Sequence, residues 1–433
     1  MTPAVGYTEM RDSGIEWVGM IPKDWDINIL FQLVSQVKNK NKDLAETNLL
    51  SLSYGKIKRK NIDHTDGLIP ASFDSYNIID TGDIVLRLTD LQNDQTSLRV
   101  GRSTEKGIIT SAYITLRPVN HKTSKFLYYL LHAFDIRKGF YGMGAGVRQG
   151  LTYDEVKVLK LPLPSISEQT AIATYLDTQC AKIDEIIAEA KASIEDYKQW
   201  KASIIYEAVT KGLDPKAEMK DSGIEWIGEI PKSVSCSFVG KHFEITLGKM
   251  LCNSPDNDQY TLEPYYCAAN VHFSGILCDD LKEMWFSPLD KRKYLAQSGD
   301  LLVVEGGAGA GGSFVLSEQD KIAYFQNSIL RVRPKRDNNV RYLKYLIEAL
   351  VPQDYINYVC NRATIPHFTK EKLSATPFLV FSGIQQKGIA DHLDDVCAKI
   401  DKIISQKQSL VFDLESYKKS LIYEVVTGKR RAC

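Results

Sequence analysis

A segment of twelve residues occurs twice in this chain, and this duplication constrains the fold more than any other feature. Asp12–Lys23 reads DSGIEWVGMIPK and returns 209 residues later as Asp221–Lys232, DSGIEWIGEIPK. Two shorter stretches return 217 residues later: Cys180–Asp184 as Cys397–Asp401, and Ser203–Thr210 as Ser420–Thr427. A repeat of about 210 residues is far longer than the units of roughly 20–50 residues that build solenoids. The chain is therefore predicted to contain a duplicated domain.

The stretches between these matches have diverged, and only weak echoes remain. Thr81–Leu86 (TGDIVL) resembles Ser298–Val303 (SGDLLV), and Tyr113–Pro118 resembles Ile329–Pro334. The offset grows from 209 to 217 before the first echo, so eight extra residues lie early in the second variable stretch. We expect the two halves to share one arrangement of their main elements, which we call the frame, and to differ in surface detail.

Length and composition are those of a globular protein. The 433 residues are 44% hydrophobic and 25% charged, which suits two domains rather than a fibrous or disordered chain. No run of 18 apolar residues predicts a membrane span, and the first twelve residues do not resemble a signal peptide. The eight cysteines form no CxxC pair, which favours free thiols in a reducing cytoplasm over a zinc site or a disulfide framework.

The net charge is zero, which by itself argues against a stand-alone nucleic-acid binder. The charge is unevenly distributed, however. Residues 22–160 hold 20 Lys and Arg against 15 Asp and Glu, residues 165–212 hold 5 against 8, and residues 231–376 hold 17 against 16. The first variable stretch is therefore modestly basic, and the second is nearly balanced.

A long helix is predicted after each variable stretch. Ser165–Glu168 and Ser382–Gln385 both fit a capping box, and apolar residues then recur at steps of three and four. Gly212 and Gly428 supply left-handed stops. Some 45 residues at about 1.5 Å each make a rod of roughly 65–70 Å, too long to bury its apolar stripe against one small domain.

We expect the two long helices to pack against each other as an antiparallel coiled coil, although two independent surface helices are the alternative. Their apolar stripes are wider than a two-helix seam requires, which indicates further helices from a partner protein. The residues expected to contact that partner are Ile186, Trp200, Ile205, Ile403, Tyr417 and Ile422.

The variable stretches are predicted to be mixed α and β. Strands are expected at residues 83–88, 112–117 and 301–305, and helices at 124–134 and 340–350. The predicted fold is α+β: two similar domains separated by the paired helices, with a pseudo-twofold relation. The predicted boundaries are 1–21 for an opening segment, 22–162 for the first domain, 163–213 for the first long helix, 214–230 for the repeated opening segment, 231–378 for the second domain and 379–433 for the second long helix.

Basic, aromatic and amide side chains mingle in the variable stretches, and such side chains can neutralise phosphates or contact base edges. One loop precedes the long helix in each half, 142–152 in the first and 360–369 in the second, and both contain such side chains. The glycines of the first loop let its backbone approach a ligand closely. Each cluster taken alone is better explained as an ordinary solvated surface than as a contact. The candidate DNA-binding residues are Tyr54, Lys56, Lys58, Arg59, Arg87, Arg102, Arg148, Gln149, Asn270, Arg292, Lys293, Arg362 and His367.

Catalytic motifs are scarce. Gly307–Gly312 fits G-x-G-x-x-G, but the next residues, 313–316, predict a strand where a dinucleotide site needs a helix, so a flexible loop is favoured. No phosphate-binding G-x-x-x-x-G-K-[ST], no zinc-binding H-E-x-x-H and no Asn/Asp-Pro-Pro-aromatic tetrapeptide occurs. Neither catalytic residues nor metal ligands are predicted, and no cofactor is expected on this chain.

The pattern resembles the specificity subunits of type I restriction–modification systems along the whole chain. The resemblance rests on the duplicated DSGIEWxGxIP segments, on the helix opening at Pro162–Gln169, and on Lys182–Asp184 with Lys399–Asp401. The second helix opening, Phe381–Gln386, departs from it because it lacks the prolines.

This resemblance implies a non-catalytic subunit in which each variable stretch is a target recognition domain that reads one half of a bipartite, asymmetric DNA sequence. The helices would fix the unread spacer and dock two methyltransferase subunits. S-adenosylmethionine would bind to those subunits, and ATP and magnesium to a separate restriction and translocation subunit. The expected location is the cytoplasm of a bacterium or archaeon, with no membrane contact.

Two other functions stay open at this point. A self-sufficient DNA methyltransferase would bind S-adenosylmethionine as an isolated chain, which calorimetry can test. A scaffold that bridges proteins through its coiled coil would show no sequence preference on a pool of random duplexes in the presence of its methyltransferase partner.

Overall fold

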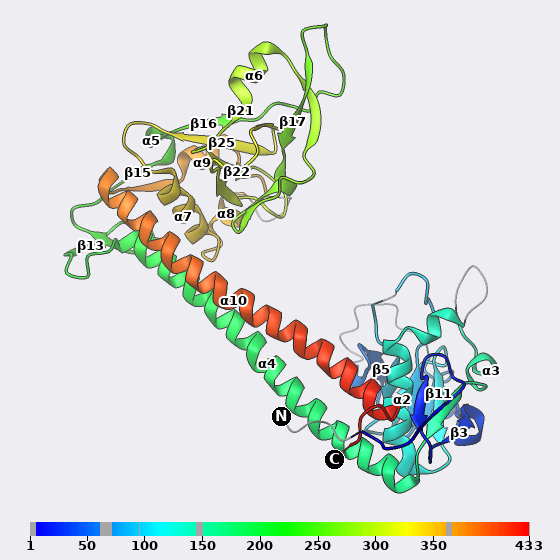
Figure 1. Cartoon of the computed structure of the whole chain (residues 1–433). Helices are drawn as coiled ribbons and strands as arrows, with labels where there is room; N and C mark the ends of the chain where they lie inside the picture. The colour runs from blue at the N-terminus through cyan, green and yellow to red at the C-terminus, as the bar shows by residue number, and fades with distance from the viewer. Residues whose placement is uncertain (1–5, 61–71, 95, 144–149, 361–365, 433) are drawn as a thin grey trace. The chain divides into compact units, whose positions relative to one another are not determined.

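The computed structural model describes residues 6–60, 72–94, 96–143, 150–360 and 366–432. They form two compact units: unit 1 comprises Met1–Lys191 and Ser409–Cys433, and unit 2 comprises Ala192–Gln408. Two long helices, α4 (Ile166–Lys211) and α10 (Gly383–Val426), each contribute one part to either unit (Figure 1). No helix within the described ranges is both long and apolar enough to cross a membrane.

Each unit is built on a four-stranded antiparallel sheet with the same strand order, β4-β11-β8-β9 in unit 1 and β16-β25-β22-β23 in unit 2. The middle strands β8 and β22 are buried at every position, which explains their continuous apolar sequence. The bounds in unit 1 are β4 Val34–Gln36, β8 Ile84–Leu86, β9 Val100–Arg102 and β11 Ile114–Pro118. Those in unit 2 are β16 Phe243–Leu247, β22 Leu301–Val304, β23 Ser313–Val315 and β25 Ile329–Pro334.

One amphipathic helix packs on each central sheet, α2 (Ser124–Ile136) in unit 1 and α7 (Val340–Leu350) in unit 2. The predictions of strands at 83–88, 112–117 and 301–305 and of helices at 124–134 and 340–350 are thereby confirmed. The two sequence echoes coincide with β8 and β22 and with β11 and β25, so the echoes mark the shared sheet.

A two-stranded ladder joins the beginning and the end of each variable stretch. In unit 1, β3 (Asp26–Ile29) pairs with β12 (Lys160–Leu163), and in unit 2, β15 (Ser235–Phe238) pairs with β26 (Pro377–Val380). The domain boundaries predicted at 162/163 and 378/379 fall inside β12 and β26. Each long helix therefore begins directly after a strand that pairs with the beginning of its variable stretch.

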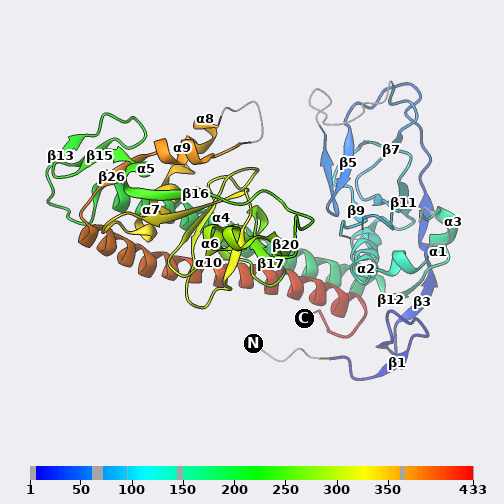
Figure 2. The same ribbon diagram turned by 90° about the horizontal axis from the view of Figure 1, so that it is seen from above.

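The units differ outside this frame. Unit 1 carries two hairpin-like ladders, β5 (Leu50–Ser53) with β6 (Lys56–Arg59) and β7 (Asn77–Ile79) with β10 (Gly107–Ile109). Figure 2 shows β5 and β7 at one end of unit 1 and β3 and β12 at the other. Unit 2 carries a second sheet in the order β20-β17-β24-β21, with β17 Thr261–Tyr266, β20 Lys282–Phe286, β21 Leu295–Ala296 and β24 Ala323–Phe325.

Short elements complete both units. Unit 2 has a small ladder of β18 (Val271–His272) with β19 (Gly275–Ile276) and the helix α6 (Pro288–Tyr294). The remaining helices are α1 Leu30–Leu33, α3 Tyr153–Val156, α5 Val239–His242, α8 Tyr355–Val359 and α9 Lys370–Ala375, and short 3-10 turns cover His121–Thr123, Gly139–Gly142 and Ala268–Asn270.

The long helices run antiparallel within each unit. In unit 1, Asp184 and Lys191 of α4 pair with Lys418 and Glu415 of α10. In unit 2, Lys201 pairs with Asp401, and Ile194, Ile400 and Ile404 share an apolar cluster. Later residues of α4 meet earlier residues of α10 in both places, which confirms the predicted antiparallel pairing and the α+β class.

The helix ends follow the sequence signals, with one difference. Before α10, Ser382 donates to the Gln385 side chain and Gln385 N donates to Ser382 Oγ, a complete capping box. Before α4, Glu168 N donates to Ser165 Oγ at 3.3 Å, but the Glu168 carboxylate accepts from the Tyr7 hydroxyl at 2.5 Å instead. Gly212 and Gly428 adopt φ of 75° and 71° and terminate the two helices.

The duplicated opening segments form hairpins that dock on helix ends. The strands are β1 Met10–Asp12 with β2 Met20–Pro22 in unit 1, and β13 Met219–Asp221 with β14 Glu229–Pro231 in unit 2. Tyr423 of α10 donates to Trp17 O at 3.0 Å, and Tyr206 of α4 donates to Ile227 O at 2.9 Å. The first opening segment thus packs on the end of the second long helix, and the second opening segment on the end of the first.

Candidate nucleic-acid interface

The hairpin β5–β6 of unit 1 carries four of the predicted DNA-binding residues. Ser53 pairs with Lys56, so Tyr54 and Gly55 form a two-residue turn, with φ of 48° and 75°. A turn with two left-handed residues matches the twist of a hairpin, and glycine tolerates that conformation at little cost. Alternation along the strands turns Leu50, Leu52 and Ile57 toward a small apolar cluster and leaves the cationic side chains exposed.

The four side chains are not equally free to contact a phosphate. Tyr54 is 79% exposed at the tip, and neither Lys56 nor Lys58 is ion-paired with any carboxylate that the structure describes. The guanidinium of Arg59 bonds to Glu105, and this hydrogen bond raises the pKa of Arg59 further. Phosphate contacts therefore suit Lys56 and Lys58 best, because the charge of Arg59 is already compensated.

Two predicted arginines of unit 1 lie on the frame. Arg102 on β9 donates to Ser124 Oγ of α2 at 2.8 Å, and partial burial lowers its pKa. We therefore correct the assignment of Arg102, which ties the sheet to the helix. Arg87 is half-buried just after β8, and its backbone amide pairs with Arg99 O.

Arg99 lies three residues before Arg102 in the sequence and is fully buried. Its guanidinium donates to the carbonyls of Thr89 and Asp94 and to the Tyr141 hydroxyl. Arg99 consequently shapes the connection between β8 and β9 and is unavailable to a ligand. A basic cluster in a sequence does not reveal this, because the carbonyl partners come from backbone that folds around the side chain.

The loops expected to reach a ligand are described only in part. Arg148, Gln149 and Arg362 lie outside the described residues. His367 is described and exposed, with its Nδ1 3.2 Å from Glu305 Oε2. Its backbone forms a bridge with Gly306 directly after β22, so it lies next to the glycine-rich loop.

The glycine-rich loop Gly306–Gly312 packs closely at some of its positions, and its predicted flexibility stays a prediction. Gly307 N donates to Pro366 O, and a Cβ at Gly311 would lie 2.1 Å from Ile356. Gly307 and Gly311 have φ of 91° and 85°, which only glycine adopts without strain. The strand β23 follows the loop, so the sequence expectation that no dinucleotide-binding helix starts here is confirmed.

Helix α6 exposes the predicted cations of unit 2. Ser287 caps the helix through reciprocal hydrogen bonds with Asp290. Lys291 is bound by Glu263, whereas Arg292 and Lys293 are exposed. These two side chains give unit 2 a cationic surface on an element that unit 1 lacks.

Asn270 is corrected from a ligand contact to a structural residue. It is buried, accepts a hydrogen bond from Cys267 N at 2.9 Å and donates to Leu277 O at 3.0 Å. An amide that is bonded to backbone on both sides fixes its own turn, and its burial keeps it from a base edge.

The residues chosen as partner contacts divide into two groups. Ile186, Trp200 and Tyr417 are 46%, 54% and 41% exposed, and Ile403 is partly buried. Ile205 and Ile422 are buried in the cores of unit 2 and unit 1. We correct these two: they are buried in the apolar cores of the units, so a partner cannot reach them.

Two duplicated polar contacts hold the frame together, and neither was identified as such from the sequence. Asp83 and Asp300 bind Arg117 and Arg333 through two hydrogen bonds each. Lys125 and Tyr129 of α2 bind Asp177 of α4, and Arg341 and Tyr345 of α7 bind Asp394 of α10. These contacts fix the orientation of the variable elements. Across the described ranges, no group of three or more His, Cys, Asp or Glu side chains is placed to hold a metal ion.

Comparison with known proteins agrees with this architecture. Residues 102–196 match the type I restriction modification DNA specificity domain. A type I restriction enzyme specificity subunit of Methanocaldococcus jannaschii, MjaX, is 24% identical over 431 residues, which cover 96% of this chain and 95% of that protein.

Two solved structures share the fold. A chain from a type I restriction–modification system, studied for its complex assembly and conformational transition, superposes with a TM-score of 0.69 at 16% identity and covers 93% of this chain and 98% of that one. The HsdS subunit of Thermoanaerobacter tengcongensis gives 0.50 at 15% identity, with 93% and 97% covered. The chain is therefore similar over nearly its whole length to a type I restriction enzyme specificity subunit, contains a region that matches the DNA specificity domain, and shares the fold of these two solved chains.

Proposed function

We propose that this chain recognises a bipartite, asymmetric DNA sequence, with each unit reading one half. The observation that carries the proposal is a shared frame with different exposed cations. Both units have the same sheet order and the same Asp–Arg pairs, yet unit 1 exposes Lys56 and Lys58 on a hairpin and unit 2 exposes Arg292 and Lys293 on a helix. Related frames suit related poses on a duplex, and different surfaces suit different half-sites.

In this proposal phosphate contacts position the units and a few base contacts specify the sequence. Lys56, Lys58, Arg292 and Lys293 neutralise phosphates, and the loops that hold Arg148, Gln149, Arg362 and His367 supply base contacts. Each bidentate base contact contributes about 1–3 kcal/mol of discrimination against the wrong base.

The long helices fix the spacer between the half-sites and recruit the partner subunits. Ile186, Trp200 and Tyr417 are exposed apolar side chains on these helices, as expected for docking two methyltransferase subunits. S-adenosylmethionine, ATP and magnesium bind to the methyltransferase and restriction subunits. The complex acts in the cytoplasm of a bacterium or archaeon.

A matched change of helix length tests the proposal. One heptad is inserted in α4 between Lys191 and Ala192, and one at the same level of α10 between Val411 and Phe412. Seven residues at about 1.5 Å lengthen the pair by roughly 10 Å, which corresponds to about three base pairs at 3.4 Å each. The methylation sites of cells that carry the complete system should then keep both half-sites and gain about three base pairs of spacer. Altered half-sites with an unchanged spacer would contradict the proposal.

A further inference from the structure

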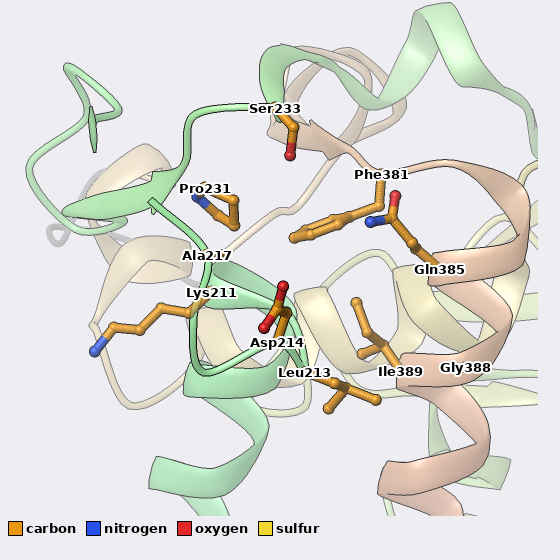
Figure 3. A pocket seen from close by; sticks show the side chains of 11 residues that line it. Lys211, Leu213, Asp214, Ala217, Pro231, Ser233, Phe381, Gln385, Gly388 and Ile389 are labelled. Carbon is orange, nitrogen blue, oxygen red and sulfur yellow. The ribbon is translucent and has the colours of Figure 1, made fainter. Parts of the chain in front are cut away.

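A cavity of about 390 Å³ opens in unit 2 where the end of α4 meets the start of α10. Its apolar wall consists of Leu213, Pro231, Phe381 and Ile389, and Figure 3 shows the Phe381 ring and the Ile389 side chain facing the same space. Polar groups from Gln385 and Asp214 border it, whereas Lys211 points away from the other lining residues. An apolar hollow with a few polar groups has the character of a binding site.

The corresponding position in unit 1 is filled by an aromatic side chain. Tyr7 packs edge-on against Trp25 with ring centroids 5.9 Å apart, and its hydroxyl donates to Glu168 at the start of α4. Burial and this hydrogen bond raise the pKa of Tyr7, so its phenol stays protonated. Unit 1 therefore shows which type of side chain this part of the frame accommodates.

The duplication places different residues at these positions in unit 2. At the repeat offset of 209, Lys216 is equivalent to Tyr7 and Val234 to Trp25. At the offset of 217, Gln385 is equivalent to Glu168. Lys216 is exposed, and Val234 is much smaller than an indole. Phe381 stands where unit 1 has Pro164 and restores only one of the two missing rings. The cavity lies beside Ala217 and Gln385, where Tyr7 would lie in a faithful copy of unit 1.

The free groups of the cavity define the occupant. Gln385 Oε1 already accepts hydrogen bonds from Ser382 N and Oγ, and its Nε2 donates to nothing in the described part of the chain. Gln385 is exposed, so its Nε2 is an accessible donor at the edge of the apolar wall, and the Asp214 carboxylate on the same border is an acceptor. A phenol hydroxyl can accept, whereas an indole N–H only donates and a phenyl ring does neither. We propose that the cavity receives a tyrosine side chain of a partner polypeptide, in the place that Tyr7 fills in unit 1. The proposal rests on the proposed function only for the source of that side chain, a subunit of the assembled complex.

Two variants are designed to fill the cavity, one at Gly388 on its lining and one at Lys216, which precedes the lining residue Ala217. Lys216→Tyr restores the internal tyrosine of unit 1, and Gly388→Leu adds a side chain where a Cβ meets no atom within 4 Å. Lys220→Tyr is the matched control, because Lys220 is an exposed residue of the same opening segment and, unlike Lys216, is not next to a residue that lines the cavity.

Ligand-observed NMR with the full chain and N-acetyl-L-tyrosinamide measures binding directly. We expect tyrosinamide to bind at least fivefold more strongly than N-acetyl-L-leucinamide or N-acetyl-L-tryptophanamide. Binding should be lost in Lys216→Tyr and Gly388→Leu and retained in Lys220→Tyr. Equal binding of the three amides, or undiminished tyrosinamide binding in either folded cavity-filling variant, would overturn the proposal.

The source of the tyrosine is tested by assembly with the methyltransferase subunit. Calorimetry should show at least tenfold weaker association for Lys216→Tyr and unchanged association for Lys220→Tyr. Equal association of the two variants would overturn a partner tyrosine as the occupant. No DNA enters either experiment, so a failure of the proposed DNA recognition, seen as absent sequence preference, is distinguished from a failure of this inference.

Discussion

Arg117 on β11 binds Asp83 at the start of β8, with Nε 2.8 Å from Oδ1 and Nη2 2.7 Å from Oδ2. Arg333 on β25 binds Asp300 in the same bidentate way. Both aspartates are almost completely buried, so removing either arginine would leave a buried charge without a partner. This constraint explains why a Gly-Asp and an Arg-Pro dipeptide persist in both halves while their neighbours differ.

Asp135 on α2 is a buried carboxyl group in unit 1. Burial raises its pKa to about 6, and the hydrogen bond from Arg99 N offsets only part of this effect. The folded state therefore holds the proton more tightly than the unfolded chain, whose aspartates titrate near 3.9. The stability contributed by the protonated group is complete below about pH 4 and is lost as the pH rises through about 6.

Asp135→Asn should consequently stabilise the protein only when the pH is high enough to ionise the wild-type carboxyl. The asparagine side chain keeps an oxygen for Arg99 N. The difference in unfolding free energy should grow from near zero at pH 4 to about 1–3 kcal/mol at pH 7.5. Urea denaturation of both proteins across this range measures the difference. A difference that does not vary with pH would contradict the assignment.

His132, one turn earlier on α2, tests the same principle with the opposite sign. Burial lowers its pKa to about 4, so its contribution is present above pH 6.5 and is lost as the pH falls through 4. The effects of Asp135 and His132 on the pH dependence of the unfolding free energy partly cancel in the wild type. For this reason the Asp135→Asn effect is defined as a difference between two proteins at each pH.

At the scale of elements, one polar contact attaches each domain helix to a long helix. Tyr129 of α2 donates to Asp177 of α4 at 2.8 Å, and Tyr345 of α7 donates to Asp394 of α10 at 2.7 Å. Burial raises the pKa of both phenols, and the cation one turn earlier, Lys125 or Arg341, binds the same carboxylate. The variable surfaces are thereby oriented relative to the helix on which they rest.

Asp177→Ala and Asp394→Ala should each lower the unfolding free energy by about 1–3 kcal/mol, because a partly buried tyrosine hydroxyl loses its acceptor. Asp395→Ala is the control on the neighbouring residue, whose exposed pair with Lys399 is worth less than about 0.5 kcal/mol. Chemical denaturation of the three variants measures the effect. Equal losses of unfolding free energy for Asp394→Ala and Asp395→Ala would contradict a stabilising contact between Asp394 and the helix α7.

The local sequence predicted the helices and strands better than it predicted the burial and the contacts of single side chains. Apolar spacing and capping residues are properties of one segment, so the long helices, their ends and the buried strands could be located. Ile205 and Ile422 could not be placed, because the residues that cover them, such as Ile227 and Ile21, come from distant parts of the chain. The same holds for Arg102 and Asn270, whose hydrogen-bond partners lie on other strands, helices or turns. Exposure therefore depends on tertiary contacts that a local pattern does not contain.

At the scale of the whole molecule, zero net charge and a DNA-binding role are compatible because a local cationic surface does not require a net positive charge. Arg59, Arg117, Arg333 and Arg341 are all bound by carboxylates. On the elements that differ between the units, Lys56 and Lys58 in unit 1 and Arg292 and Lys293 in unit 2 form no ion pair with a described carboxylate. Electrostatic affinity for DNA should then come from a small number of phosphate contacts, and partner subunits would supply the rest.

Salt dependence measures how many such contacts each unit makes. Each neutralised phosphate contributes about 0.9 to the slope of log K against log salt for duplex DNA, so Lys56→Gln with Lys58→Gln should reduce the slope of the assembled complex by about 1.8. Arg292→Gln with Lys293→Gln should reduce it by a similar amount in unit 2. Arg59→Gln is the matched control and should change the slope much less, because Glu105 already compensates its charge. These losses should be uniform across DNA sequences, since phosphate contacts carry no base information. If Arg59→Gln lowered the slope as much as the loss of one hairpin lysine, the charge of Arg59 would have to be free in the complex. The distinction between cations that are bound by carboxylates and cations that contact phosphates would then be wrong.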